Sequence, residues 1–139
     1  MREVIPQTLW IGNARDVRDV QRVLDLGIAA IIDLAREEPP ISFPREIIYS
    51  RLPLIDGEEN NPAVLQTAIE TVARFVQAEI PTLVACSGGM SRSPAIVAAA
   101  MSKINSIHFA EAIEQIAATG PCDVAPGLWN EIQALLAVD

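Results

Sequence analysis

The stretch that decides the fold of this chain is TLVACSGGMSRSP, residues 82–94. Its apolar run Leu83–Ala85 is typical of a short buried strand. Cys86 follows at the end of that run, and Arg92 comes after five small or flexible residues, two of them glycine. Beyond Pro94, a residue that fits the first turn of a helix, the pattern is alanine-rich and helical. The sequence therefore predicts a thiol and an arginine on a loop between a strand and a helix.

This loop has the composition of an anion-binding site. Gly88 and Gly89 permit backbone conformations closed to other residues, so that N–H groups can approach a ligand closely. Successive N–H groups and the N-terminus of the following helix both favour an anion. Arg92 can hold a phosphate through two parallel hydrogen bonds. The same positive field favours the thiolate form of Cys86, and a thiolate in such a cradle is a nucleophile directed at phosphorus.

The motif Cys-x5-Arg-Ser-Pro, placed between a strand and a helix, resembles the signature loop of cysteine-dependent protein phosphatases and is most similar to the dual-specificity branch. The segments IPQTLWIG (5–12) and GIAAIIDL (27–34) are similar to the opening of such a domain and to its first helix-to-strand step. The resemblance implies that Cys86 is the nucleophile. It also implies that Ser93 hydrogen-bonds the sulfur and eases its departure as thiolate. The phosphate-binding residues are then Ser87, Gly88, Gly89, Met90, Ser91 and Arg92.

Cleavage of a phosphoester also needs a general acid for the leaving oxygen. Asp56 precedes Gly57 in a loop after a predicted strand, 86 − 56 = 30 positions before Cys86. The family carries its acid on a similar loop at a similar distance, so the resemblance implies that Asp56 has this role. Glu58 and Glu59 are alternatives on the same loop, and an ordinary turn aspartate is the alternative interpretation of Asp56.

The chain departs from the family pattern beside the nucleophile. Ala85 stands where the family usually has a histidine that orients and activates the thiol. Activation must then rest on the loop amides, the helix dipole, Arg92 and Ser93. The segment GPCDVAPG (120–127) is similar only in outline to the family's segment before its last helix. The five residues after Cys86 include no lysine or histidine, which disfavours an inositol phospholipid substrate.

The periodicity of apolar residues predicts alternating strands and helices, with Pro53 ending one strand. The strands are expected at 4–11, as one or two short strands, 29–34, 47–52 and 83–85, and the helices at 13–26, 62–76, 94–104, 109–116 and 126–136. The alternation predicts an α/β fold with a mostly parallel sheet of four to five strands, flanked by helices on both faces, as the resemblance to dual-specificity phosphatases also implies. Ligands of such sheets bind at the carboxyl ends of strands, where Cys86 falls.

Composition limits the remaining possibilities. The 139 residues are half apolar and carry a net charge of −8. We expect one domain, residues 1–139, with a real core, and neither nucleic acid nor an anionic membrane as partner. The two cysteines, Cys86 and Cys122, do not make a disulfide framework, and no signal peptide or membrane span is expected, so the expected location is the cytoplasm.

Two further residues with reactive side chains carry weaker expectations. Cys122 is expected to be an unreactive thiol, with a redox disulfide to Cys86 as the alternative. His108, near the start of a predicted helix, is expected on the surface. No cluster of cysteine and histidine has the spacing of metal ligands. The proposed chemistry calls for no metal or cofactor.

Three functions remain open from the sequence. The first is a phosphatase that acts on phosphotyrosine, and on phosphoserine and phosphothreonine as further substrates, through a phosphocysteine intermediate. Its partner would be a phosphorylated protein or a small phosphomonoester, and a monomer is expected. The second is a non-catalytic phosphate-binding protein on the same fold, against which Cys86, Arg92 and Asp56 together count. The third is a rhodanese-type sulfurtransferase, which explains neither Asp56 nor the Arg-Ser-Pro step.

Overall fold

The computed structural model describes residues 1–138 and is organised around one sheet. The sheet has five strands in the order β1-β2-β5-β3-β4. They are β1 (Arg2–Ile5), β2 (Leu9–Gly12), β3 (Ala30–Ala35), β4 (Ile48–Leu54) and β5 (Thr82–Ala85). β1 is antiparallel to β2, whereas β2, β5, β3 and β4 run parallel to one another. The predicted mostly parallel sheet is confirmed, and β5 lies at its centre.

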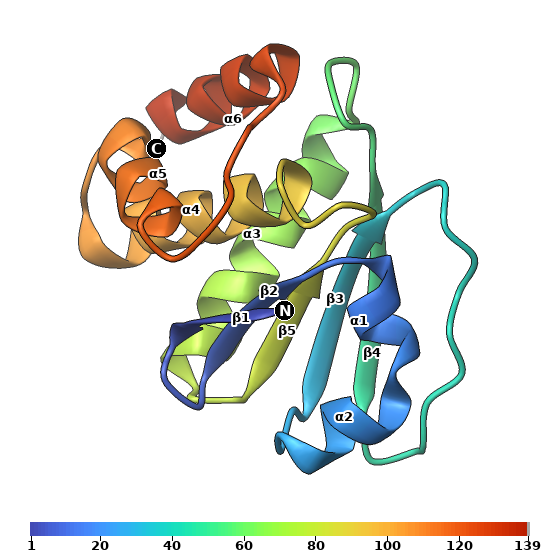
Figure 1. The fold of residues 1–139 in the computed structure, drawn as a ribbon. Coiled ribbons are helices and arrows are strands. Elements are labelled where there is room, and N and C mark those ends of the chain that lie inside the picture. The colour runs from blue at the N-terminus through green and yellow to red at the C-terminus, as the bar shows by residue number, and fades with distance from the viewer. Residues whose placement is uncertain (139) are drawn as a thin grey trace.

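Helices cover both faces of this sheet (Figure 1). On one face lie α1 (Ala14–Arg18) and α2 (Val20–Asp25), and on the other lie α3 (Pro62–Gln77), α4 (Arg92–Asn105), α5 (Phe109–Ala117) and α6 (Pro126–Val138). Side chains of a strand alternate between the two faces. Leu83 and Ala85 accordingly belong to the smaller core under α1 and α2, while Val84 and Cys86 belong to the larger core under α3 to α6. The alternation therefore directs the Cys86 thiol toward the α4 side of the sheet.

The central helix α4 is buried along most of its length, from Arg92 to Ala100. Its alanines are small enough for the helix to pack closely on its neighbours, and it contacts both α3 and α5. The helix ends at Asn105, and Ser106 adopts the left-handed conformation there, with φ of 54°. The residues that follow Cys86 are therefore attached to a rigid, buried element.

Two predictions about local structure are wrong. Pro53 does not end the strand, because β4 continues to Leu54. β4 is an edge strand of the sheet, where a proline is tolerated because one side of the strand has no partner. The predicted helix 13–26 is two helices, broken at Asp19, whose side chain accepts a hydrogen bond from the backbone N–H of Arg22 and so caps α2.

The break at Asp19 also changes which residues face the core. Leu24 and Leu26 continue the helical spacing of apolar residues within 13–26, but their exposed fractions are 39% and 41%. The apolar spacing would place them on the buried face only if one continuous helix ran across the break. The second helix starts at a different rotation about its axis, so the same spacing leads to a different face. Val17 and Val23 alone supply the fully buried side chains of α1 and α2.

Within residues 1–138, no helix combines the length and apolarity that crossing a bilayer would require.

Candidate active site

The loop that joins β5 to α4, residues 86–92, is called the phosphate loop here. Cys86 is 2% exposed, and its Sγ accepts hydrogen bonds from the backbone N–H groups of Gly89 at 3.2 Å and Ser93 at 3.5 Å. Gly89 has a φ of +73°, and a Cβ there would lie 3.0 Å from the carbonyl oxygen of Gly12. Only glycine fits this position without strain. The loop thus turns N–H groups toward the sulfur, as an anion cradle requires.

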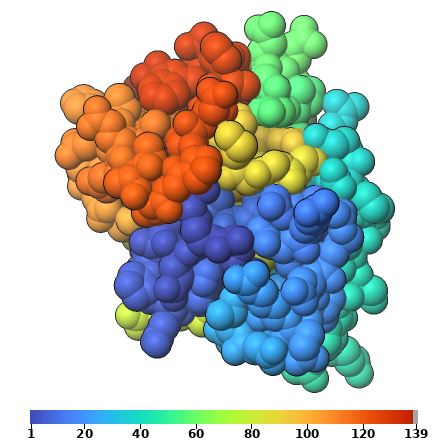
Figure 2. Space-filling model, in the orientation of Figure 1, coloured from blue at the N-terminus to red at the C-terminus, as the bar shows by residue number. Residues whose placement is uncertain are grey.

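The phosphate loop reaches the surface between four other segments. In Figure 2 its yellow atoms are visible in a hollow among the blue N-terminal part, the cyan segment after β3, the green segment after β4 and the orange-red segment before α6. Hydrogen bonds join the loop to each of these neighbours. The backbone N–H of Ala14 donates to Ser87 O, and that of Asp123 donates to Met90 O at 2.7 Å. The cradle is therefore assembled from segments far apart in the sequence.

Arg92 occupies the first position of α4 and is 3% exposed. Its Nη1 and Nη2 each donate a hydrogen bond of 2.7 Å to a carboxylate oxygen of Glu37, and Nη1 also donates to Leu54 O at 2.9 Å. Nε has no partner among the described residues. A guanidinium has five N–H donors. Three are used, and the two that remain, on Nε and Nη2, lie along one edge of the group.

The charges of Arg92 and Glu37 stabilise each other. Burial alone would lower the pKa of Arg92, but the hydrogen bonds and charge of Glu37 outweigh it and hold that pKa above its ordinary value. The pKa of Glu37 falls from 4.5 to about 2, chiefly because its side chain accepts hydrogen bonds from Arg92. Both groups consequently stay charged throughout the neutral pH range. The sequence analysis did not single out Glu37, since nothing in its local pattern signals a partner 55 positions away.

Asp56 lies on the loop after β4 and contacts the phosphate loop directly. The Oγ of Ser91 donates a hydrogen bond of 2.6 Å to Oδ1 of Asp56. Asp56 and Arg92 also line the same hollow of about 300 Å³. The alternatives Glu58 and Glu59 are exposed and do not line it. Of the three carboxylates considered for the acid, Asp56 is the one that lines the hollow beside Arg92.

Asn60 fixes the shape of the loop that carries Asp56. Its Oδ1 accepts a hydrogen bond of 2.7 Å from the backbone N–H of Ile55, and its Nδ2 donates to Gly57 O at 3.0 Å. Nδ2 also donates to Oε1 of Glu131 in α6, at 2.9 Å. This buried amide was missed from the sequence, where Asn60 resembles any polar turn residue.

The structure also places three other residues that the sequence analysis considered, which are Ser93, Cys122 and His108. The hydroxyl of Ser93 is buried and has no partner among residues 1–138, while its backbone N–H contacts the Cys86 sulfur. The residue at the N-terminal cap position of α4 is Ser91. Cys122 is half-buried, and burial raises the pKa of its thiol. His108 is exposed, as expected.

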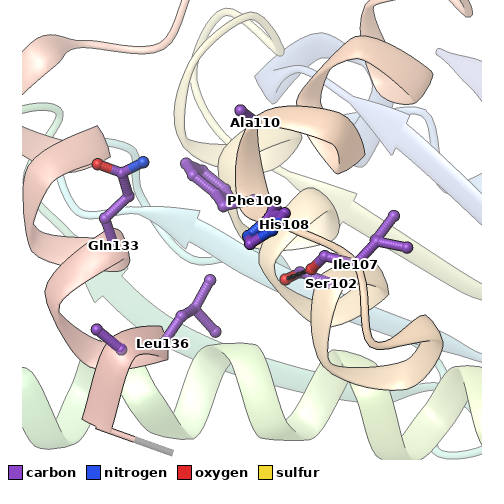
Figure 3. Close-up of a pocket in the computed structure, with 8 residues that line it drawn as sticks. Ser102, Ile107, His108, Phe109, Ala110, Gln133 and Leu136 are labelled. Carbon is purple, nitrogen blue, oxygen red and sulfur yellow. Dashed lines mark hydrogen bonds between the residues drawn. The ribbon is translucent and has the colours of Figure 1, made fainter.

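A separate surface pocket of about 580 Å³ lies between α5 and α6. Figure 3 shows His108 and Phe109 on one side of it and Gln133 and Leu136 on the other. It shares no lining residue with the phosphate loop and adjoins the opposite end of α4, at Ser102. We therefore assign it no part in the chemistry of Cys86.

Residues 9–132 match the family described as dual specificity phosphatase, catalytic domain. The match spans most of the chain, and the chain belongs to this family of cysteine-dependent phosphatases. It is 24% identical to dual specificity phosphatase 28 of Homo sapiens over 131 residues, which are 93% of the chain and 74% of that protein. It is 29% identical to dual specificity protein phosphatase 13B of Mus musculus, over 97% of the chain and 72% of that protein.

Solved structures agree on the fold. The crystal structure of human dual specificity phosphatase 28 superimposes with a TM-score of 0.86 at 24% identity, over 99% of this chain and 96% of that one. The human tyrosine phosphatase-like serine/threonine/tyrosine-interacting protein also gives a TM-score of 0.86, at 21% identity and with the same coverage. The predicted fold class and family are confirmed, and phosphorylated molecules are the substrates that this family implies.

Proposed function

We propose that the chain is a single catalytic domain that hydrolyses phosphotyrosine in proteins, and phosphoserine and phosphothreonine as further substrates. The observation that carries the proposal is the free edge of Arg92. Its Nε–H is buried and without a partner among the described residues, and one Nη2–H beside it is likewise unused. A buried donor pair of this kind fits two oxygens of one phosphoryl group.

The first chemical step is an in-line attack of the Cys86 thiolate on phosphorus. A sulfur–phosphorus bond forms while the bond to the leaving oxygen breaks, and Asp56 gives that oxygen a proton. Arg92 and the N–H groups of residues 87–92 bind the equatorial oxygens, where charge must be stabilised in the transition state. The hydrogen bond from the Gly89 N–H to Sγ supports the thiolate before the attack.

The second step is another in-line displacement, in which the sulfur is the leaving group and phosphate is released. Water attacks the phosphocysteine, the sulfur–phosphorus bond breaks, and Asp56 accepts a proton from the water. The Ser93 hydroxyl then donates a hydrogen bond to the departing sulfur. Support for this role is the position of Ser93, whose backbone N–H already lies 3.5 Å from Sγ and whose buried Oγ is unengaged among residues 1–138.

The site and the composition support a proposal about the substrate and the setting. A phosphorylated protein or a small phosphomonoester is the partner that this chemistry requires, and we propose that the chain acts on it as a monomer in the cytoplasm. A net charge of −8 opposes binding to nucleic acid and to anionic membranes. The thiol of Cys86 also needs reducing conditions to remain a nucleophile.

Turnover of 4-nitrophenyl phosphate tests the proposal, with Cys86→Ser as the decisive variant and Cys122→Ser as its matched control. We expect hydrolysis by the wild-type chain and by Cys122→Ser, and none by Cys86→Ser. Tight vanadate binding without turnover by the wild-type chain would instead establish a non-catalytic phosphate-binding module. Transfer of sulfur from thiosulfate to cyanide would establish a sulfurtransferase.

A further inference from the structure

The carboxylate of Glu131, in α6, accepts three hydrogen bonds from the loop that carries Asp56. Its Oε2 accepts one of 2.6 Å from the backbone N–H of Glu59. Its Oε1 accepts one of 3.3 Å from the backbone N–H of Asn60 and one of 2.9 Å from Nδ2 of the same residue. Glu131 does not line the hollow that holds Asp56, and no step of the proposed reaction uses it. Its contacts therefore bear on the loop and not on the substrate.

The backbone of this loop is strained at the point where Glu131 binds it. Glu59 has a φ of 72°, in the left-handed region that a residue with a side chain rarely adopts. Backbone strain of this kind persists only where the surrounding structure holds it. The two successive N–H groups of Glu59 and Asn60 both donate to one carboxylate, as in the backbone nests that bind anions. The loop thus forms a small anion nest, and the carboxylate of Glu131 fills it.

A second contact between α6 and the loop lies one helical turn before Glu131. A Cβ at Gly127 would lie 2.9 Å from both the Cβ and the backbone N of Glu58, so a larger residue there would displace the loop. Residues four positions apart lie on the same face of a helix, so Gly127 and Glu131 present one surface to the loop. Figure 1 shows the start of α6 beside the segment that links β4 to α3.

Another face of α6 is anchored in the larger core. Leu128 and Ile132 belong to that core and are fully buried. The segment before the helix is held as well, because the backbone N–H of Ala125 donates a hydrogen bond of 3.0 Å to Oγ of Ser91, which in turn donates to Asp56. α6 therefore rests on the core and gives the loop a fixed support.

We propose that Glu131 is a positioning residue that holds the loop of Asp56 in the geometry needed for proton transfer, an assignment that rests on the proposed function of the site. It acts through the backbone of Glu59 and the amide groups of Asn60. The loss of Glu131 should impair the donation of the proton and leave the binding of the phosphoryl group unchanged. A residue that only stabilises the fold would not separate these two effects.

The test compares Glu131→Gln with the wild-type chain in the hydrolysis of aryl phosphates of graded leaving-group acidity. Glutamine keeps the size of the side chain, but its NH₂ group must face an N–H donor of Glu59 or Asn60. We expect kcat to fall roughly 10- to 100-fold for the poorest leaving groups, the cost of a misplaced catalytic group. Substrates with good leaving groups should lose little, and the dissociation constant of orthovanadate should not change.

The double variant Glu131→Gln with Asp56→Asn shows whether Glu131 acts through Asp56. Its kcat should equal that of Asp56→Asn, because an acid that is absent cannot be misplaced. A further fall in the double variant overturns the assignment. Glu114→Gln is the matched control, since Glu114 is an exposed carboxylate on a different helix, α5, and this variant should behave as the wild type.

Gly127→Ala tests the same support without changing the carboxylate. Alanine favours a helix more than glycine does, so the helix itself is not weakened. The added Cβ would nevertheless meet the backbone N of Glu58 at 2.9 Å and push the loop away. We expect the same selective loss for poor leaving groups. Circular dichroism shows whether each variant is folded.

Hydrogen exchange of the backbone amides of residues 57–60 separates this assignment from the proposed function. Exchange should be faster in Glu131→Gln than in the wild type and unchanged in Glu114→Gln, because the freed N–H groups become open to solvent. A wild-type chain that hydrolyses no aryl phosphate contradicts the proposed function, yet faster exchange in Glu131→Gln still supports the role of Glu131 in holding the loop. Unchanged exchange in a folded Glu131→Gln, or an equal loss of kcat for every leaving group, overturns the assignment.

Discussion

The Oγ of Ser91 lies 2.6 Å from Oδ1 of Asp56 and donates a hydrogen bond to it, which joins the phosphate loop to the loop of the proposed general acid. The same Oγ accepts a hydrogen bond of 3.0 Å from the backbone N–H of Ala125, in the segment before α6. One hydroxyl group thus connects three segments around Cys86. The proposed acid and the phosphate loop are therefore positioned together rather than separately.

We expect Asp56→Asn to lower kcat by roughly 10²- to 10⁴-fold for substrates with poor leaving groups, because these need a proton as the bond to oxygen breaks. Substrates with good leaving groups should lose much less. Hydrolysis rates of a series of aryl phosphates of graded leaving-group acidity measure the difference. An equal loss for every member of the series would show that Asp56 is not the acid.

Ser91→Ala should also lower kcat for substrates with poor leaving groups, but by less than Asp56→Asn does. The variant removes the hydrogen bond to Asp56 and leaves the backbone N–H of Ala125 without its acceptor. We expect kcat to fall by up to roughly 100-fold, with the same dependence on the leaving group, because the acid is displaced and not removed. The double variant Ser91→Ala with Asp56→Asn should be little worse than Asp56→Asn alone. A fully multiplicative loss would mean that the two residues act independently.

Gly89→Ala and Gly88→Ala form a matched pair in the phosphate loop. At Gly89 the backbone φ is +73° and a Cβ would lie 3.0 Å from Gly12 O, whereas at Gly88 a Cβ has no heavy atom of the described residues within 4 Å. We expect Gly89→Ala to cost about 1–3 kcal/mol of unfolding free energy and to abolish vanadate binding. Gly88→Ala should change the unfolding free energy little. Urea unfolding and vanadate titration test both variants, and equal behaviour of the two would contradict the loop geometry.

Asn60→Ala should loosen the loop that carries Asp56. The substitution leaves the partly buried carboxylate oxygen of Glu131 and the backbone groups of Ile55 and Gly57 without the Asn60 side-chain amide. We expect a loss of about 1–3 kcal/mol in unfolding free energy, the usual cost of unsatisfied buried polar groups. We also expect a lower kcat for poor leaving groups. Asn61→Ala, which removes only a helix cap at the surface, should affect stability but not the dependence on the leaving group.

The ion pair between Glu37 and Arg92 has a defined pH signature. Because the pKa of Glu37 falls from 4.5 to about 2 in the folded chain, its contribution to stability is complete above about pH 4.5 and is lost as the pH falls toward 2. The difference in unfolding free energy between the wild type and Glu37→Gln should therefore be constant from pH 5 to pH 8 and narrow below pH 4.5. Urea unfolding at a series of pH values measures it. A difference that did not vary below pH 4.5 would contradict the depressed pKa.

Much of the site follows from one local pattern. The strand before Cys86, the glycines after it and the helix beginning near Pro94 are neighbours in the sequence, and backbone preferences and side-chain volume determine their arrangement. The alternation of strands and helices likewise predicts the layered fold and places Cys86 at the carboxyl end of a strand. The predictions at Pro53 and Asp19 were wrong because the effect of a proline on a strand, or of an aspartate on a helix, depends on the surrounding structure. A proline is tolerated in β4 only because β4 is an edge strand, and the sequence does not reveal which strand is at the edge.

The sequence by itself determined the class of fold and the strand, loop and helix that carry the proposed nucleophile and anion cradle, because each depends on residues close together in the chain. Only the tertiary structure decided what surrounds them. Arg92 meets Glu37 across 55 positions, and Asn60 meets Glu131 across 71. Such pairs depend on β3 lying beside β5 and on α6 packing near the loop after β4, and no periodicity or spacing encodes these neighbours. The chemistry of the phosphate loop is therefore local, while its orientation is a property of the whole fold.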